Sequence, residues 1–247
     1  MCRLLRESAV RKLALCLVGL LGTLTPVLAS EPPQDRVYSR IRIREKDYGY
    51  VSMGALWSFP PDREEKVIFV CWEDVSNGFD QQRTWVREAV RATWEKHSAL
   101  SFRGWGGCKK KNAGIRIQVS DDGPHCKELG RALDAMTNGM VLNFTFNKWS
   151  QECREDKEYC IRTIAVHEFG HAIGFAHEQN RFDAPGECQA LKQGTSGDVA
   201  LTPYDPDSVM NYCNKKYNND GRLSPLDVES LQKLYCKPTQ PNCAPQP

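Results

Sequence analysis

The sequence lacks an apolar run long enough to cross a membrane. Leu13–Leu28 is apolar but only 16 residues long, whereas a spanning helix needs about 20 residues. Basic residues precede this run, and Val27-Leu28-Ala29 offers small or aliphatic side chains to a signal peptidase. These features predict a secretory signal over residues 1–29 and a mature chain starting near Ser30, which argues against a stable membrane anchor.

The chain also lacks an excess of either charge. It has 33 basic and 31 acidic residues, a net charge of +2. The predicted signal carries four basic residues and one acidic residue, so the mature chain has a net charge of −1. This balance gives no reason to expect nucleic acid or an anionic membrane as a partner. The mature chain is long enough for one domain with a sizeable core, and we expect a monomer.

Histidine is scarce, yet three of the five histidines fall within the eleven residues 167–177. On a helix, His167 and His171 lie one turn apart on the same face, so both imidazoles can reach one metal ion. Gly174 is suited to a left-handed helix end, after which the chain would turn back and present His177. Three neutral imidazoles leave the fourth zinc position open, as in catalytic sites. The alternative is a surface helix with unrelated histidines.

The pattern His-Glu-x-x-His-x-x-Gly-x-x-His resembles that of the metzincin zinc endopeptidases. Met210 in Asp207–Tyr212 matches the clan's methionine turn, which lies beneath the zinc. Tyr212, two residues later, makes the chain similar to the astacin family, in which such a tyrosine is an extra zinc ligand that swings away to bind the transition state. Asn211 departs from the family, which usually has histidine there. Matrixin-like features occur in the C-terminal helix, but no matrixin-type cysteine switch is present, because residues 22–62 contain no cysteine.

The resemblance implies a zinc-dependent metalloendopeptidase that hydrolyses protein or peptide substrates. His167, His171 and His177 would hold one catalytic zinc, and Glu168 would be the general base. Tyr212 would donate a hydrogen bond to the oxyanion. Two alternatives stay open, a secreted zinc-containing binding module and a zinc hydrolase acting on other substrates.

The apolar patterns predict an α+β fold. A buried strand is expected over Lys66–Trp72 and a helix from Asp80 to about His97. Half-buried strands should follow, and then the helix that carries His167 and His171, called the metal helix below. Ser224-Pro225-Leu226-Asp227 predicts the start of a final helix. The resemblance adds a metzincin-type arrangement, with an upper subdomain of twisted mixed sheet plus two helices and a small irregular lower subdomain. The remaining stretches expected to be extended are residues 100–105, 115–119, 131–135 and 140–146.

The position that matches the clan's substrate-binding edge strand is Arg131-Ala132-Leu133. An edge strand has unpaired backbone groups, so it could bind an extended peptide; the alternative is an edge covered by a loop. Lys215 and Lys216 follow the methionine turn, whose downstream segment lines a substrate pocket in the clan. They suggest a preference for acidic side chains; the alternative, which the sequence favours, is two solvated lysines.

We expect residues 30–64 to be an extension or a short propeptide, residues 65–237 to be the catalytic domain that the resemblance implies, and residues 238–247 to be a Pro-rich tail. Asp47 could occupy the metal position; the alternative is a solvated loop. Asp121-Asp122-Gly123 and Asp134 are candidates for a structural calcium site. Asn143-Phe144-Thr145 is a glycosylation sequon if it is exposed in a eukaryotic host.

Nine cysteines follow the predicted signal, which indicates disulfides formed in an oxidising compartment, extracellular or periplasmic. Because nine is odd, at least one thiol is left over, and Cys71 in its predicted buried strand is one candidate. A bridge between Cys188 and Cys213 would tether the segments around the third histidine and the methionine turn.

Overall fold

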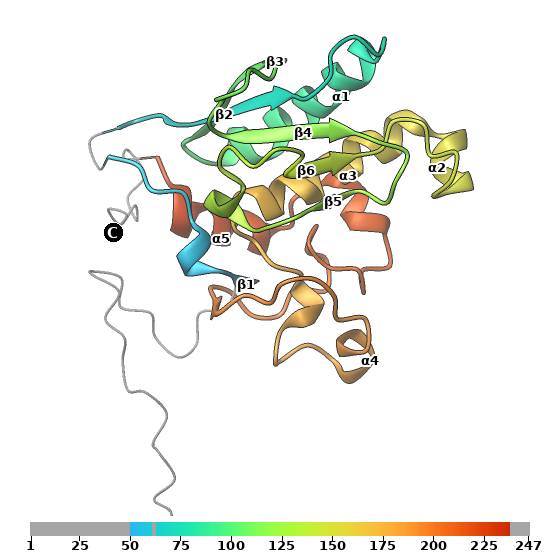
Figure 1. Ribbon diagram of the computed structural model, residues 1–247. Helices are drawn as coiled ribbons and strands as arrows, with labels where there is room; N and C mark the ends of the chain where they lie inside the picture. Colours follow the sequence, from blue (N-terminus) through green and yellow to red (C-terminus); the bar gives the residue numbers. More distant parts are fainter. Residues whose placement is uncertain (1–49, 61–62, 238–247) are drawn as a thin grey trace, which may run out of the picture. The chain divides into compact units, whose positions relative to one another are not determined.

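The computed structural model describes residues 50–60 and 63–237. The predicted signal, most of the predicted extension including Asp47, and the predicted tail lie outside the described residues. The described chain is an α+β domain, as expected (Figure 1).

The larger sheet has five strands in the order β3-β2-β4-β6-β5. Strands β3, β2, β4 and β6 run parallel to one another, and only β5 is antiparallel, along the edge (Figure 1). Helix α1 connects the first two parallel strands, as a crossover between parallel strands requires. The strand bounds are β2 Lys66–Trp72, β3 Leu100–Gly107, β4 Ile115–Val119, β5 His125–Cys126 and β6 Met140–Leu142.

Two long helices pack with this sheet. Helix α1, Asp80–Val90, continues as the π-helical turn η2, Arg91–Glu95, and contacts α3, Lys157–Ala172. The final helix, α5 Pro225–Tyr235, begins with the predicted cap, a reciprocal capping box between Ser224 and Asp227. The remaining elements are short: α2 Gln151–Glu155, α4 Gly186–Gln189, β1 Tyr50–Val51, β7 Val199–Ala200, η1 Met53–Ala55, η3 Gly130–Leu133, η4 Glu178–Asn180 and η5 Tyr217–Gly221.

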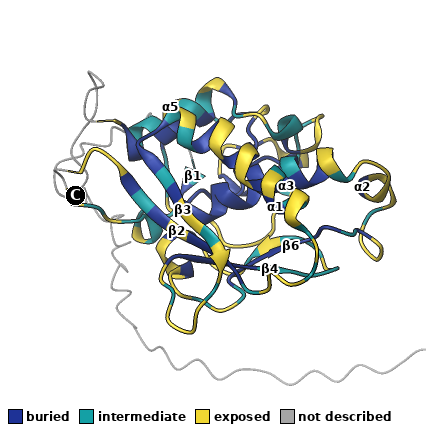
Figure 2. Cartoon of the chain, turned by 90° about the horizontal axis from the view of Figure 1, so that it is seen from above, coloured by how far each residue is buried: buried dark blue, intermediate teal, exposed yellow. Residues whose placement is uncertain are grey.

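Helix α3 runs through the core, and its second half is buried on every face (Figure 2). Trp94 of η2 donates an indole hydrogen bond to the carbonyl of Val166, at 2.8 Å. Phe169 packs edge-on against Phe102 of β3. A helix surrounded by core is held by contacts from several elements at once, so the residues it carries are fixed in place.

The strand expected at Arg131-Ala132-Leu133 is wrong, because Gly130–Leu133 is a 3-10 turn, η3. Gly130 adopts a φ of +53°, and a Cβ there would overlap the carbonyl oxygen of Ala55. This close approach turns the backbone and buries Leu133 in the core. The edge of the sheet is formed instead by β5, which pairs with β6. The alternation of apolar and polar residues could not predict β5, because the strand has only two residues.

The predicted boundary at residue 65 is wrong for Tyr50–Pro60, which is built into the domain. Strand β1 pairs antiparallel with β7, and Ala176 donates its N–H to the carbonyl of Tyr50 at 2.9 Å. The indole of Trp57 donates to the carbonyl of Ala172 at the end of α3, at 2.8 Å. This segment therefore clamps the turn that follows the metal helix.

The sequon and the calcium candidates serve local structure. Asn143 is buried, and its side-chain oxygen accepts hydrogen bonds from the backbone N–H groups of Thr145 and Phe146. The buried amide is therefore not accessible for glycosylation in the folded chain. Asp121 accepts from Thr145 and Asn143. Within residues 50–60 and 63–237 the acidic groups form no metal-binding cluster with these aspartates.

Candidate metal centre

Both ends of the metal helix, α3, are set by neighbouring residues in the chain. Asp156 caps the N-terminus of α3 by accepting a hydrogen bond from the N–H of Tyr159. After Ala172 the chain turns at Gly174, which has a φ of +105° and donates to the carbonyl of His171. A side chain at Gly174 would also press on Leu56, so both conformation and space favour glycine.

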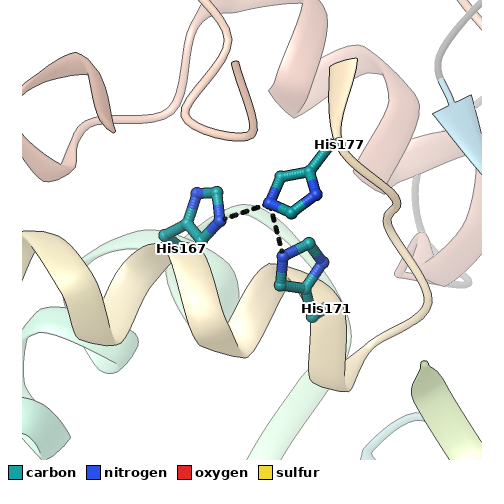
Figure 3. Close-up of side chains that lie close together, drawn as sticks. All are labelled: His167, His171 and His177. Atoms are coloured by element: carbon teal, nitrogen blue, oxygen red, sulfur yellow. Dashed lines mark hydrogen bonds between the residues drawn. The ribbon is translucent and has the colours of Figure 1, made fainter. Parts of the chain in front are cut away.

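This turn brings the three predicted metal ligands together (Figure 3). Nε2 of His177 lies 3.2 Å from Nε2 of His167 and 3.2 Å from Nε2 of His171. All three rings are buried. Among the described residues this is the one group of histidine, cysteine or acidic side chains placed to share a metal ion.

The outer nitrogen of each ring is tied to a backbone carbonyl. Nδ1 of His167 contacts the oxygen of Val209 at 2.8 Å, and Nδ1 of His171 contacts that of Phe175 at 2.8 Å. Nδ1 of His177 contacts the oxygen of Gln193 at 3.0 Å. A carbonyl only accepts, so each Nδ1 carries the proton and each Nε2 presents a lone pair.

Three converging lone pairs repel one another unless a cation lies between them. A tetrahedral zinc with Zn–N bonds of about 2.0–2.1 Å separates its nitrogen ligands by about 3.3 Å, close to the separations seen here. Backbone carbonyls that orient metal-binding histidines are typical of zinc sites. The donor set therefore fits Zn²⁺.

Burial also keeps the ligands in the neutral form that binds metal. The pKa of His167 is lowered to about 3, first by desolvation and then by the adjacent His177. Desolvation also lowers the pKa of His171 and of His177. Neutral imidazoles bind a metal ion without first losing a proton.

Glu168, the predicted general base, points into the same buried space. Its side chain is 3% exposed, and Oε2 has no hydrogen-bond partner within the described part of the chain. Desolvation raises the pKa of Glu168 to about 8. A dication nearby would favour the carboxylate and lower this pKa. A buried carboxylate oxygen without a hydrogen-bond partner is costly in a fold and is typical of a group that serves a ligand.

Tyr212 lies over the histidines, as the resemblance implies. Its ring stacks on that of His167, with centroids 4.9 Å apart, and lies 4.6 Å from that of His177. Its backbone N–H donates to the side chain of the buried Gln179 at 3.1 Å. Desolvation and the neighbouring Glu168 raise its pKa, so the hydroxyl keeps its proton and can donate a hydrogen bond.

The methionine turn packs directly beneath the metal helix. A Cβ at Gly170 would overlap the sulfur of Met210, which explains the glycine inside the helix. Asn211, the departure from the astacin pattern, is buried and donates to the carbonyl of Asp205 at 2.9 Å. Its amide thus holds the turn in place of the usual histidine.

Asp227 was missed by sequence reasoning as part of the site. Its carboxylate accepts from the hydroxyl of Ser208 at 2.7 Å and from the N–H of Val209 at 2.9 Å. The carbonyl of Val209 orients His167. Asp227, at the start of α5, therefore stabilises the metal centre through its hydrogen bond to Val209. The only signal in the sequence was the capping box, which explained Asp227 without reference to the site.

A cleft of about 480 Å³ opens in front of the histidines. Neither Arg131-Ala132-Leu133 nor the two lysines Lys215 and Lys216 line it. The sequence did not lead us to expect that β5 and the adjoining loop would line this cleft. The lining residues are Pro124, His125, Cys126, Lys127, Glu128, Leu129, Trp149, Glu168, His171, His177, Gln193, Gly194, Thr195, Tyr212 and Tyr217.

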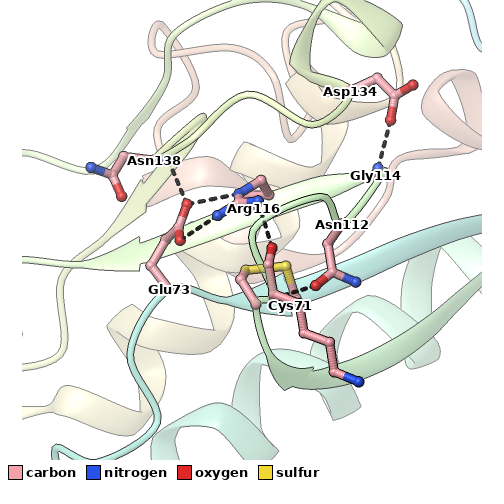
Figure 4. Close-up of a disulfide and its surroundings, with 9 residues drawn as sticks. Cys71, Glu73, Asn112, Gly114, Arg116, Asp134 and Asn138 are labelled. Atoms are coloured by element: carbon pink, nitrogen blue, oxygen red, sulfur yellow. Dashed lines mark hydrogen bonds and ion pairs between the residues drawn. A yellow bond between two sulfur atoms is a disulfide. The ribbon is translucent and has the colours of Figure 1, made fainter.

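Three disulfides join described residues, and one confirms the expected bridge between Cys188 and Cys213. The others are Cys153–Cys160 and Cys71–Cys108, so the prediction that Cys71 is free is wrong (Figure 4). Strand burial could not reveal this bridge, because Cys108 comes from the loop after β3, 37 residues away. The free thiol of the described residues is Cys126 on β5.

We expect alkylation of the denatured, unreduced protein to label Cys126 and to leave Cys71 and Cys108 unlabelled, as read by peptide mass spectrometry. In the native protein labelling should be slow, because desolvation, the charge of Glu168 and a hydrogen bond raise the pKa of this thiol and the thiolate is the reactive form. Prior reduction provides the control in which all cysteines react. A label on Cys71 without reduction would contradict the assigned pairing.

Comparisons with known proteins agree with this geometry. The matrixin family model matches residues 72–184. The zinc metalloproteinase nas-30 of Caenorhabditis elegans is 28% identical over 116 residues, covering 33% of this chain and 16% of that protein. The astacin-like metalloprotease toxin 1 of Loxosceles intermedia is 24% identical over 207 residues, covering 68% of this chain and 70% of the toxin. The chain spans only 16% of nas-30, 18% of the zinc metalloproteinase nas-36 of Haemonchus contortus and 24% of nas-23 of Caenorhabditis elegans.

The solved structure of myroilysin has a similar fold, with a TM-score of 0.54 at 17% identity, covering 78% of this chain and all of that one. The fold and the histidine site thus define a zinc-binding α+β domain of the metzincin type. The chain is similar to metzincin zinc metalloproteases of both the astacin and the matrixin kind.

Proposed function

We propose that this protein is a secreted zinc-dependent endopeptidase. The observation that carries the proposal is the convergence of the Nε2 lone pairs of three neutral imidazoles beside the buried carboxylate of Glu168, whose Oε2 has no partner in the described residues. A purely structural zinc site has no use for such a carboxylate.

The residues of the chain divide the chemistry between them. Zinc, when held by His167, His171 and His177, polarises the scissile carbonyl and lowers the pKa of water from about 15.7 towards 7. Glu168 accepts a proton from the attacking water and returns it to the leaving amine. Tyr212 donates a hydrogen bond to the oxygen on which negative charge develops.

A protein or peptide substrate suits the edge of the sheet. Strand β5 has one neighbour, β6, and it lines the cleft beside Glu168. Its free edge can pair with an extended peptide. The disulfides suit an oxidising compartment. No helix within residues 50–60 and 63–237 is long and apolar enough to cross a membrane.

The test is hydrolysis of casein by the purified mature chain, from Ser30 onward, with its zinc content measured in the same sample. We expect about one zinc per chain and the release of peptides with new amino termini. Stripping the zinc with a chelator should stop the release, and adding zinc back should restore it. A sample that holds zinc and leaves casein intact would refute the proposal.

The two alternatives give different results. A zinc-containing binding module would retain zinc but hydrolyse no substrate, whereas a zinc hydrolase of another kind would cleave activated esters and not casein. The likeness to zinc metalloproteinases favours the peptidase, although the chain spans only a part of several of these relatives.

Replacing Tyr212 with phenylalanine should lower kcat for peptide hydrolysis by about 100- to 1,000-fold, the usual effect of removing one oxyanion donor. KM and zinc content should change little, because the ring stays packed on His167. Steady-state kinetics, with Tyr204→Phe as a control for loss of a nearby hydroxyl, provide the measurement. Unchanged kcat would rule out a transition-state contact by Tyr212.

A further inference from the structure

Two exposed aromatic side chains lie in the cleft. Trp149 and Tyr217 are each 41% exposed, and both belong to the cleft lining. Single exposed apolar residues are common, but two large rings at one cavity leave apolar surface for a ligand to cover. The other large exposed hydrophobic residues of the described chain lie outside this lining: Phe69, Val75, Tyr159, Phe182 and Leu191.

Trp149 lies in the loop between β6 and α2, where two neighbours hold it in position. Its ring lies 6.0 Å from that of the fully buried Phe146. Gly123, in the loop between β4 and β5, lies next to the indole, and a Cβ there would come within 3.2 Å of Nε1. The ring is therefore supported on two sides while another part of it faces the cleft.

Tyr217 is held by an unusual turn. The three residues that follow it, Asn218–Asp220, all have left-handed φ values of 43–53°. Each such residue other than glycine costs free energy, which the surrounding contacts must offset. Asp220 accepts a hydrogen bond from the hydroxyl of Tyr159 on α3 at 2.9 Å. Gly221 packs on Thr163 of the same helix. The metal helix thus fixes the place of Tyr217.

The charges near this surface do not favour an acidic ligand. Lys215 and Lys216 are exposed outside the lining, and Lys216 lies 3.9 Å from Asp220. The remaining charged residues of the lining, Lys127 and Glu128, are exposed and opposite in sign.

We propose that Trp149 and Tyr217 determine specificity by binding an aromatic side chain of the substrate next to the scissile bond. This inference rests on the proposed peptidase function. Aromatic rings bury a large apolar area and gain further from offset or edge-on contact with other rings. Pro124 adds a third apolar surface to the lining. The preference replaces the acidic one suggested by Lys215 and Lys216.

The test uses quenched fluorescent peptides that differ at one residue on either side of the cleaved bond. For wild type we expect kcat/KM to fall in the order Phe, Leu, Ala, Asp at one of these two positions. Trp149→Ala and Tyr217→Ala should each lower kcat/KM for the Phe peptide by about 10- to 100-fold, the range for apolar pockets. The Ala peptide should change by less than about threefold. Phe182→Ala, which removes an exposed ring outside the cleft, is the matched control.

A second measurement does not depend on turnover. In the Glu168→Ala background a fluorescent Phe peptide should bind at least about 10-fold more tightly than the Ala peptide, and adding Trp149→Ala should abolish this difference. Equal binding of the two peptides, or equal losses on all peptides in the kinetic test, would overturn the inference. A protein that fails to cleave casein yet keeps the binding difference would refute the peptidase function and leave the aromatic pocket standing.

Discussion

Replacing Glu168 with alanine is expected to lower kcat/KM for peptide hydrolysis by about 10⁴-fold, the upper range for loss of a general base, while the protein keeps its zinc. The carboxylate is buried beside the histidines, and its Oε2 has no hydrogen-bond partner in the described residues. The desolvation cost of the carboxylate disappears in the variant, which offsets the loss of its contact with Cys126. The measurements are steady-state kinetics and zinc content, with thermal unfolding to show that the fold is unchanged.

Glu128→Ala is the matched control for this variant. Glu128 lines the same cleft but is exposed, so its loss should change kcat/KM by less than about threefold. Glu168→Gln keeps the shape of the side chain and removes the base, so it should be as inactive as the alanine variant. Loss of zinc from Glu168→Ala, or activity near that of wild type in Glu168→Gln, would contradict the role of a base.

Replacing His171 with alanine is expected to abolish stable zinc binding and, with it, all measurable turnover. Two imidazoles remain in the variant, and catalytic zinc sites have three protein ligands. Removing a group that hydrogen-bonds to a metal-binding histidine already lowers metal affinity by about 10- to 100-fold. Removing the histidine itself should therefore lower the affinity further. Zinc content after dialysis and the increase of the melting temperature with added zinc provide the readouts, because a metal that binds only the folded chain stabilises it.

His125→Ala separates this effect from a general loss of histidine in the cleft. His125 lines the cleft on β5 but is exposed, and its Nδ1 contacts the carbonyl of Gly123 at 2.8 Å. Zinc content and the zinc-dependent rise in melting temperature should match those of wild type. If His171→Ala held zinc as firmly as His125→Ala, the three-histidine site would be wrong.

Local rules were sufficient for much of the domain. The spacing of His167, His171 and Gly174 follows from helix geometry and from the freedom of glycine at positive φ, and the structure agrees. The capping box at Ser224 was likewise readable, because its partners lie three residues apart. Such features depend on neighbours in the chain, so they appear in the sequence.

The edge of the cleft was not readable in this way. Arg131-Ala132-Leu133 has a pattern that suits a strand, but contact with Ala55 turns this backbone, and β5 takes the place beside β6. The pairing of Cys71 with Cys108 and the clamp formed by Tyr50–Pro60 also depend on residues distant in the chain.

Short-range backbone geometry sets the metal helix, the spacing of its histidines and the glycine turn, so these features could be predicted from the sequence. The free nitrogen of each imidazole depends on tertiary contacts, since the carbonyls of Val209 and Gln193 come from distant segments. The tertiary structure also placed Trp149 and Tyr217 in one cleft, although 68 residues separate them in the chain.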